Sequence, residues 1–113
     1  MKKEYNPIAD KEVFLVGHFK GIDYSKETDN FDDYLSIKNR IPKEDIIKHI
    51  EKLKPLCLKC SLSYDIFTKE PLESAGFYLD GDFFFPIDFL HYLKKYDIGI
   101  PLEYEEYMAK ETR

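Results

Sequence analysis

The most regular alternation of hydrophobic and polar residues lies between residues 56 and 67. Every second side chain from Leu56 to Tyr64 is hydrophobic, and most of the side chains between them are polar. This period of two predicts a strand that exposes one face to water. Residues 34–40 show a weaker alternation and predict a second, shorter strand.

A further strand is predicted over residues 12–22, where hydrophobic side chains occur on both faces. In a regular strand Val13, Leu15 and Phe19 would share one face. The other face would carry Phe14, Val16, His18 and Ile22. Hydrophobic residues on both faces favour a central or doubly covered strand. Gly17 and Gly21 are the positions at which this strand would bulge or bend.

Residues 76–85 predict a β-hairpin. Asp80 and Gly81 suit a two-residue turn, because both central positions of a type I′ turn need positive φ. In that register Leu79 lies opposite Asp82, and aromatic residues fall on both faces of the hairpin. One face is expected to pack against helices, and the other against a partner or a loop. Pro86 lacks an N–H group and is expected to leave the sheet and begin a helix.

Helical spacing of hydrophobic residues predicts helices over residues 42–53 and 86–96 and a short third helix that begins at Pro101. The first two helices carry acidic residues in the first turn and lysines near the end, which complements the helix dipole. In the third, Tyr104, Tyr107 and Met108 are expected on one side, opposite Glu103, Glu105 and Glu106.

Together these elements follow the order β-β-α-β-β-β-α-α. This order predicts an α+β fold with a mainly antiparallel sheet of about five strands and two or three helices packed on it. A chain of 113 residues is near the common size of one domain, so residues 1–113 are predicted to form a single domain. Residues 1–10 are polar and are expected to be a loosely ordered lead-in.

The net charge of the chain limits the classes of partner it can bind. The formal net charge is −5, which argues against a general nucleic-acid binder and against binding to an anionic membrane surface. The same charge favours a basic protein partner. The N-terminus has no apolar run of the secretory type, and no stretch approaches the roughly 20 apolar residues of a membrane-spanning helix. A cytoplasmic location is therefore expected.

No motif indicates a catalytic centre, a metal site or a cofactor. Cys57 and Cys60 have CxxC spacing, but on one strand they would point to opposite faces, and no second pair completes a zinc site. His18, His49 and His91 lie on three different predicted elements. The sequence thus predicts no catalytic residue, no metal ligand and no cofactor, although distant carboxylate, histidine and tyrosine side chains could still meet in the fold.

Carboxylates interleaved with aromatic residues are the best candidates for a binding surface. Aromatic side chains anchor a protein partner, while charges steer its approach and fix its orientation. The predicted loop before residue 34 combines the two types, and the hairpin tip adds two further carboxylates. The candidate partner-binding residues are Asp23, Tyr24, Glu27, Asp29, Phe31, Asp32, Asp33, Asp80 and Asp82.

The hairpin and the helix after it resemble a pattern near the end of some small bacterial immunity proteins of polymorphic and contact-dependent toxin systems. The pattern is G-x-Y-x-D-G-x-F-x-x-P, then an aromatic-rich helix, K-Y and a Pro-led segment. It is carried by Gly76, Tyr78, Asp80, Gly81, Phe83, Pro86, Phe89, Tyr92, Lys95, Tyr96 and Pro101. This resemblance covers the last third of the chain. It implies a non-enzymatic inhibitor that occludes a basic surface of a cognate toxin domain, a nuclease being one candidate, and it assigns no individual contact residue.

Two other functions remain open from the sequence. One is a small enzyme or ligand-binding domain that uses carboxylate, histidine and tyrosine side chains from separate elements; a deep pocket lined by a histidine would favour it. The other is a phage-encoded regulator. The aromatic hairpin allows either a monomer or a homodimer.

Overall fold

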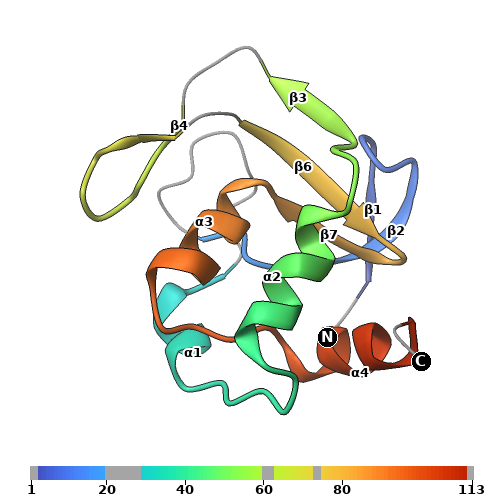
Figure 1. The fold of residues 1–113 in the computed structure, drawn as a ribbon. Helices are drawn as coiled ribbons and strands as arrows, with labels where there is room; N and C mark the ends of the chain where they lie inside the picture. Colours follow the sequence, from blue (N-terminus) through green and yellow to red (C-terminus); the bar gives the residue numbers. More distant parts are fainter. Residues whose placement is uncertain (1–2, 20–28, 60–62, 73–74, 112–113) are drawn as a thin grey trace.

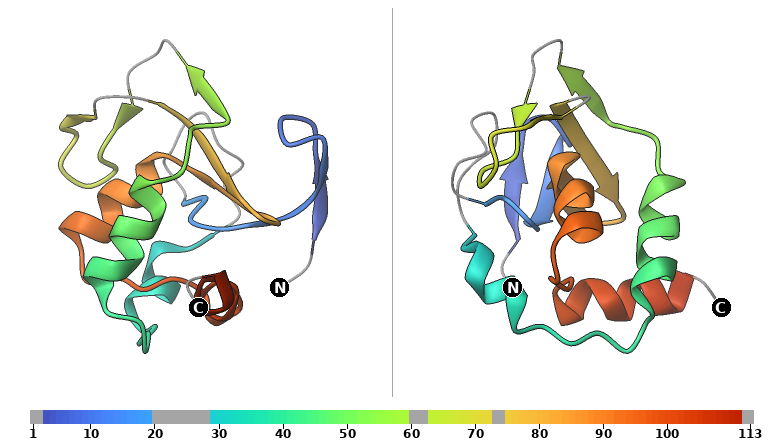
Figure 2. Two further views of the ribbon diagram at one scale, coloured as in Figure 1. Left: turned by 45° about the vertical axis from the view of Figure 1, so that its right-hand side comes forward. Right: turned by 60° about the vertical axis from the view of Figure 1, so that its left-hand side comes forward.

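A mixed β-sheet with helices on one side forms the body of the molecule (Figure 1, Figure 2). A computed structural model describes residues 3–19, 29–59, 63–72 and 75–111. The strands described are β1 (Glu4–Asn6), β2 (Lys11–Leu15), β3 (Cys57–Lys59), β4 (Ser63–Tyr64), β5 (Pro71–Leu72), β6 (Ala75–Asp80) and β7 (Phe83–Pro86). The helices described are α1 (Phe31–Leu35), α2 (Lys43–Glu51), α3 (Asp88–Lys95) and α4 (Leu102–Glu111).

The order of strands in the main sheet is β1-β2-β7-β6-β3. Strand β2 runs parallel to β7, and the other three neighbouring pairs are antiparallel. Strands β4 and β5 form a separate antiparallel ribbon. The α+β prediction is therefore confirmed, and so is the mainly antiparallel sheet.

The predicted hairpin between residues 76 and 85 forms with a different register. Asp80 lies opposite Phe83 and Leu79 opposite Phe84, so the turn is made by Gly81 and Asp82. Gly81 has a φ of 62°, which glycine adopts at little cost because it has no Cβ. Each residue of β6 therefore pairs with a β7 residue two positions later in the chain than predicted. A displacement of two leaves each side chain on its predicted face.

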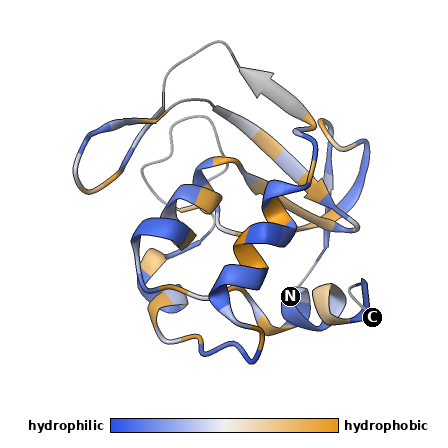
Figure 3. Ribbon diagram, viewed as in Figure 1, coloured by the Kyte–Doolittle hydropathy of each residue, from blue (hydrophilic) through white to orange (hydrophobic). Residues whose placement is uncertain are grey.

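The two faces of this hairpin belong to two cores. Tyr78, Phe83 and Phe85 pack against the helices in the larger core, while Phe77 and Phe84 pack with Val13 on the opposite face. Figure 3 shows the apolar residues of α2 and α3 where these helices lie against each other, with polar residues on their outer turns. The helices thus cover one face, and the N-terminal segment contributes Ala9 to the other.

The strand predicted over residues 12–22 is shorter than expected, because the chain bends at Gly17. Strand β2 ends at Leu15, and Gly17 has a φ of 65°. A Cβ at this position would lie 2.3 Å from the ring of Phe89. After the bend, Phe19 enters the larger core with Val16 instead of sharing a face with Val13. Residues 20–22 lie outside the described part of the chain.

The strand predicted over residues 34–40 is wrong. Helix α1 ends at Leu35, and the chain then continues without a strand as far as α2. The Asn30 side chain caps α1 by accepting the N–H of Asp32 at 3.1 Å, and this capping starts the helix inside the predicted loop. A buried Tyr34 fixes the helix against the larger core, so tertiary packing outweighed the local alternation.

The N-terminal residues also differ from expectation. Glu4–Asn6 pairs with β2 and forms the edge of the sheet, although residues 1–10 were expected to be loosely ordered. The Asn6 side chain accepts the N–H groups of Ile8 and Ala9 and closes the turn between the two strands. Residues 56–67 form β3 and β4, separated by residues 60–62, which lie outside the described part.

The three predicted helices form, with shifted ends. Pro86 is the last residue of β7, so the chain leaves the sheet after it. Tyr104 and Met108 are both buried. Glu105, which was expected on the opposite side of α4, is buried too, because its carboxylate accepts the backbone N–H groups of Arg40 and Ile41. No helix in the described ranges is long and apolar enough to span a membrane.

Candidate functional site

Those of the predicted partner-binding residues that the structure describes do not form one surface. Asp23, Tyr24 and Glu27 lie outside the described residues. The remaining six divide between residues 29–33, at the start of α1, and the tip of the β6–β7 hairpin. In all three ribbon views α1 lies away from that tip (Figure 1, Figure 2). The expected union of acidic loop and hairpin tip is therefore not seen among the described residues.

Asp29 faces the protein interior. Its carboxylate accepts the backbone N–H of His18 at 3.1 Å and the hydroxyl of Tyr34 at 3.0 Å. The same tyrosine oxygen accepts the N–H of Gly17 at 3.0 Å. Burial raises the pKa of Asp29 above its usual value, although these hydrogen bonds act in the opposite direction. Asp29 thus joins the bend at Gly17 to helix α1.

Asp32 and Asp33 are exposed in the first turn of α1. Neither makes an ion pair with any residue in the described ranges. Phe31, the residue before them, is half-buried, and its ring packs edge-on against Phe19 at 5.1 Å. Within the described part of the chain, helix α1 therefore presents two carboxylates without a cationic partner beside an anchored aromatic ring.

A residue that the sequence did not single out completes this surface. Phe67, in the loop between β4 and β5, is 53% exposed and lies edge-on to Phe31, with ring centroids 4.8 Å apart. Leu35 on α1 is also exposed. We call Phe31, Asp32, Asp33, Leu35 and Phe67 the α1 surface. Phe67 is 36 residues from Phe31 in the sequence, so no local pattern could connect them.

The loop that carries Phe67 is held by a buried carboxylate. Asp65 is fully buried and accepts the N–H groups of Phe67 at 2.8 Å and Thr68 at 3.0 Å. It also accepts a hydrogen bond from His91 Nε2 at 2.7 Å and from the Tyr96 hydroxyl at 2.9 Å. We call Asp65, His91 and Tyr96 the Asp65 cluster. It ties the β4–β5 loop to α3.

These contacts shift the pKa values of Asp65 and Tyr96 within the Asp65 cluster. Burial alone would raise the pKa of Asp65, but the donors from His91, the backbone and Tyr96 lower it well below its usual range. Burial, together with the hydrogen bond to Asp65, raises the pKa of Tyr96 to about 12. Asp65 is thus an ionised interior carboxylate with several donors.

Asp80 is also buried and takes part in a second cluster of the same residue types. Its Oδ2 atom is 2.7 Å from His49 Nε2 on α2 and 2.7 Å from the Tyr104 hydroxyl on α4. Burial and the neighbouring Asp80 carboxylate raise the pKa of Tyr104. We call Asp80, His49 and Tyr104 the Asp80 cluster. Because its carboxylate is only 8% exposed, Asp80 joins the hairpin to two helices and offers little surface to a partner.

Of the two carboxylates at this hairpin tip, Asp82 is the accessible one, with 44% of its side chain exposed. Its two carboxylate oxygens pair with Lys3 at 2.8 Å and Lys11 at 3.0 Å. The hydrogen bonds from these two lysines lower the pKa of Asp82. Its charge is therefore already compensated within the chain.

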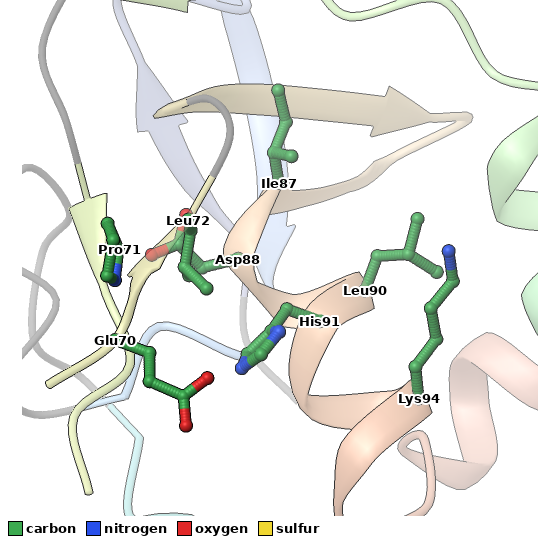
Figure 4. Close-up of a pocket in the computed structure, with 8 residues that line it drawn as sticks. All are labelled: Glu70, Pro71, Leu72, Ile87, Asp88, Leu90, His91 and Lys94. Atoms are coloured by element: carbon green, nitrogen blue, oxygen red, sulfur yellow. The ribbon is translucent and has the colours of Figure 1, made fainter. Parts of the chain in front are cut away.

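A cleft of about 400 Å³ lies between β5 and α3 (Figure 4). Leu72 lies on the β5 side of the cleft and His91 on the α3 side, while Leu90 and Lys94 lie farther from β5. Its polar groups are occupied: His91 binds Asp65, Lys94 pairs with Glu51 at 2.9 Å, and buried Asp88 accepts the Ser63 hydroxyl. The cleft therefore has few polar groups left for a ligand.

The three histidines do not come together. His49 and His91 belong to the two clusters, while the ring of buried His18 lies 3.0 Å from the Phe84 carbonyl through Nε2. Among residues 3–19, 29–59, 63–72 and 75–111, no three histidine, cysteine or carboxylate side chains are grouped as a metal site. Cys60 of the CxxC pair lies outside these ranges.

Comparison with known proteins identifies no relative: no family model matches the chain, and neither a curated protein nor a solved structure matches it significantly.

Proposed function

We propose that this protein is a non-enzymatic inhibitor that binds a basic protein through its α1 surface. The observation that carries this proposal is the exposed Phe67 ring, which lies edge-on to Phe31 beside Asp32 and Asp33, two exposed carboxylates with no ion pair to any described residue. Exposed aromatic side chains are frequent anchors in protein interfaces, and neighbouring charges steer a partner of opposite sign. The net charge of −5 adds long-range attraction for a basic partner.

The rigidity of this surface also supports an inhibitor. Phe67 sits on a loop fixed by the buried Asp65, and its ring contacts Tyr96 at 5.3 Å as well as Phe31. A side chain that is fixed before binding loses less conformational entropy in the complex. The resemblance of the last third of the chain to toxin-system immunity proteins suggests a toxin domain, such as a nuclease, as the partner.

The test is binding to the purified product of the neighbouring gene, measured by calorimetry at low and high salt. We expect Phe67→Ala to weaken binding by more than ten-fold, as loss of an anchor does. The double variant Asp32→Asn/Asp33→Asn should weaken binding at low salt and reduce its salt dependence.

A matched control is Glu44→Gln/Asp45→Asn, which removes two exposed carboxylates from the first turn of α2. It should bind nearly as well as the unchanged protein. Equal losses in both double variants would show that only net charge matters, and unchanged binding of Phe67→Ala would refute the α1 surface.

A further inference from the structure

A second cleft, between α2 and α4, differs from the one beside β5 in its chemistry. Its volume is about 480 Å³, within the usual range for small-molecule sites. We call it the α2–α4 groove. Its lining residues are Ile41, Asp45, Lys48, His49, Lys52, Met108 and Ala109. None of these belongs to the α1 surface.

The apolar part of the groove is formed by Ile41, Met108 and Ala109. Met108 is a core residue with 1% of its surface exposed, so the groove reaches the larger core. Methionine is unbranched and polarisable, and it adapts to ligands of different shape. This part suits a short alkyl or aromatic group.

The cationic part is formed by two lysines of α2. Lys48 and Lys52 are four residues apart and therefore lie on the same face of the helix. Across the described residues, no carboxylate lies within ion-pair distance of either ammonium group, although Asp45 also lines the groove. Like charges at this spacing repel each other. An anion bound between them would relieve that repulsion.

The wall between these parts is rigid. The His49 ring is 18% exposed, and its Nε2 atom is held 2.7 Å from buried Asp80. Asp80 is in turn held by Tyr104 at 2.7 Å. The Asp80 cluster therefore fixes one side of the groove before any ligand arrives, which reduces the entropic cost of binding.

A smaller hollow of about 370 Å³ shares Ile41 and Ala109 with the groove. It adds Arg40 and Lys110, together with Glu106. Its other carboxylate, Glu105, already accepts the N–H groups of Arg40 and Ile41. Cations thus outnumber uncommitted carboxylates along the whole depression, in a protein whose net charge is negative.

We propose that the α2–α4 groove binds a small amphiphilic anion: an organic phosphate or carboxylate whose apolar group contacts Ile41, Met108 and Ala109 while its anionic group lies between Lys48 and Lys52. This site is independent of the proposed partner surface. The phosphate is expected to bind more tightly than the carboxylate, because it offers more charge and more acceptor atoms to two ammonium groups.

The test is a titration of the isotope-labelled protein followed by amide NMR, with octyl phosphate, octanoate, inorganic phosphate and 1-octanol below their aggregation limits. We expect saturable shifts at Ile41, Lys48, His49, Lys52 and Ala109 with octyl phosphate, and smaller shifts with octanoate. Inorganic phosphate lacks the alkyl group, and 1-octanol lacks the anionic group. Each should therefore bind at least ten-fold more weakly than octyl phosphate.

Two variants locate the site. Lys48→Gln/Lys52→Gln should raise the Kd for octyl phosphate by roughly ten-fold. Ala109→Leu should fill the apolar part and weaken octyl phosphate binding without changing the charge. The control Lys38→Gln/Lys69→Gln removes the same charge from exposed positions outside the groove lining and should leave the Kd unchanged.

Several outcomes would overturn the proposal. They are the absence of saturable shifts in the groove, equal affinity for inorganic phosphate and octyl phosphate, or equal losses in the groove and control variants. All variants change exposed or half-exposed residues, and their folding can be checked in the same amide spectra.

Discussion

Two interior carboxylates, Asp65 and Asp80, have the same types of side-chain partner but different structural roles. Each accepts a hydrogen bond from a histidine on a helix and from a tyrosine hydroxyl. Asp65 also accepts two backbone N–H groups of its own loop. For Asp80, the described hydrogen bonds to the carboxylate come from side chains of α2 and α4.

This difference separates a local role from a global one. Asp65 shapes the β4–β5 loop and thereby sets the position of Phe67 on the α1 surface. Asp80 connects three elements that are distant in sequence and supports His49 in the wall of the α2–α4 groove. One cluster thus supports the proposed partner surface, and the other supports the proposed ligand groove. The two clusters have no residue in common, so a substitution can change one cluster and leave the other intact.

The largest effect is expected for Asp65→Ala. It removes a fully buried acceptor and leaves two backbone N–H groups, a histidine and a tyrosine hydroxyl without their partner. We expect the free energy of unfolding to fall by about 3 kcal/mol. Urea denaturation measures this change. Asp82→Ala, which removes a partly exposed carboxylate, is the control and should cost much less.

Asp80→Ala should have the next largest effect, about 2 kcal/mol in the same measurement, because no backbone donor of the described set loses its acceptor. It should also weaken octyl phosphate binding through His49 while leaving partner binding through Phe67 unchanged. If Asp80→Ala proved more destabilising than Asp65→Ala, the contrast between the clusters would be wrong.

Lowering the pH should reduce the stabilisation that the Asp65 cluster gives to the fold. Since the pKa of Asp65 is lower in the folded protein than in the unfolded chain, its ionised form stabilises the fold above about pH 4. That stabilisation is lost as the pH falls toward the folded pKa. Between pH 5 and pH 3 the unchanged protein should therefore lose about 1 kcal/mol more than Asp65→Asn does. Denaturation curves at the two pH values measure this difference; parallel losses would contradict it.

The smallest effects are expected from removing the two hydroxyls. Tyr104→Phe should cost about 1 kcal/mol, because the Tyr104 side chain is fully buried and its ring packs against Phe83 at 4.7 Å. Tyr96→Phe should cost about 0.5 kcal/mol, because Tyr96 is partly exposed and Asp65 keeps its other donors. Thermal unfolding of both variants compares them; equal costs would show that burial does not distinguish the hydroxyls.

Most secondary structure could be predicted from local patterns, and the exceptions have identifiable causes. The hairpin faces were predictable even though the register was not, because alternation fixes the face of a residue while the turn fixes its partner. The strand predicted over residues 34–40 failed, because the cap at Asn30 and the burial of Tyr34 favoured a helix. The bend at Gly17 was indicated, but its consequence for Phe19 was not.

The candidate sites show the same division. By itself the sequence determined the α+β class, the amphipathic faces of the main helices, the net negative charge and the acidic character of the segment that forms α1. Only the tertiary structure decided that Asp29 and Asp80 face inward, that Phe67 joins Phe31, and that Lys48 and Lys52 border an apolar groove. The physical reason is that periodicity reports local backbone geometry, whereas these contacts depend on how separate elements pack. Asp65 and Asp80 meet their histidine and tyrosine partners 24 to 31 residues away in the chain, beyond any local pattern.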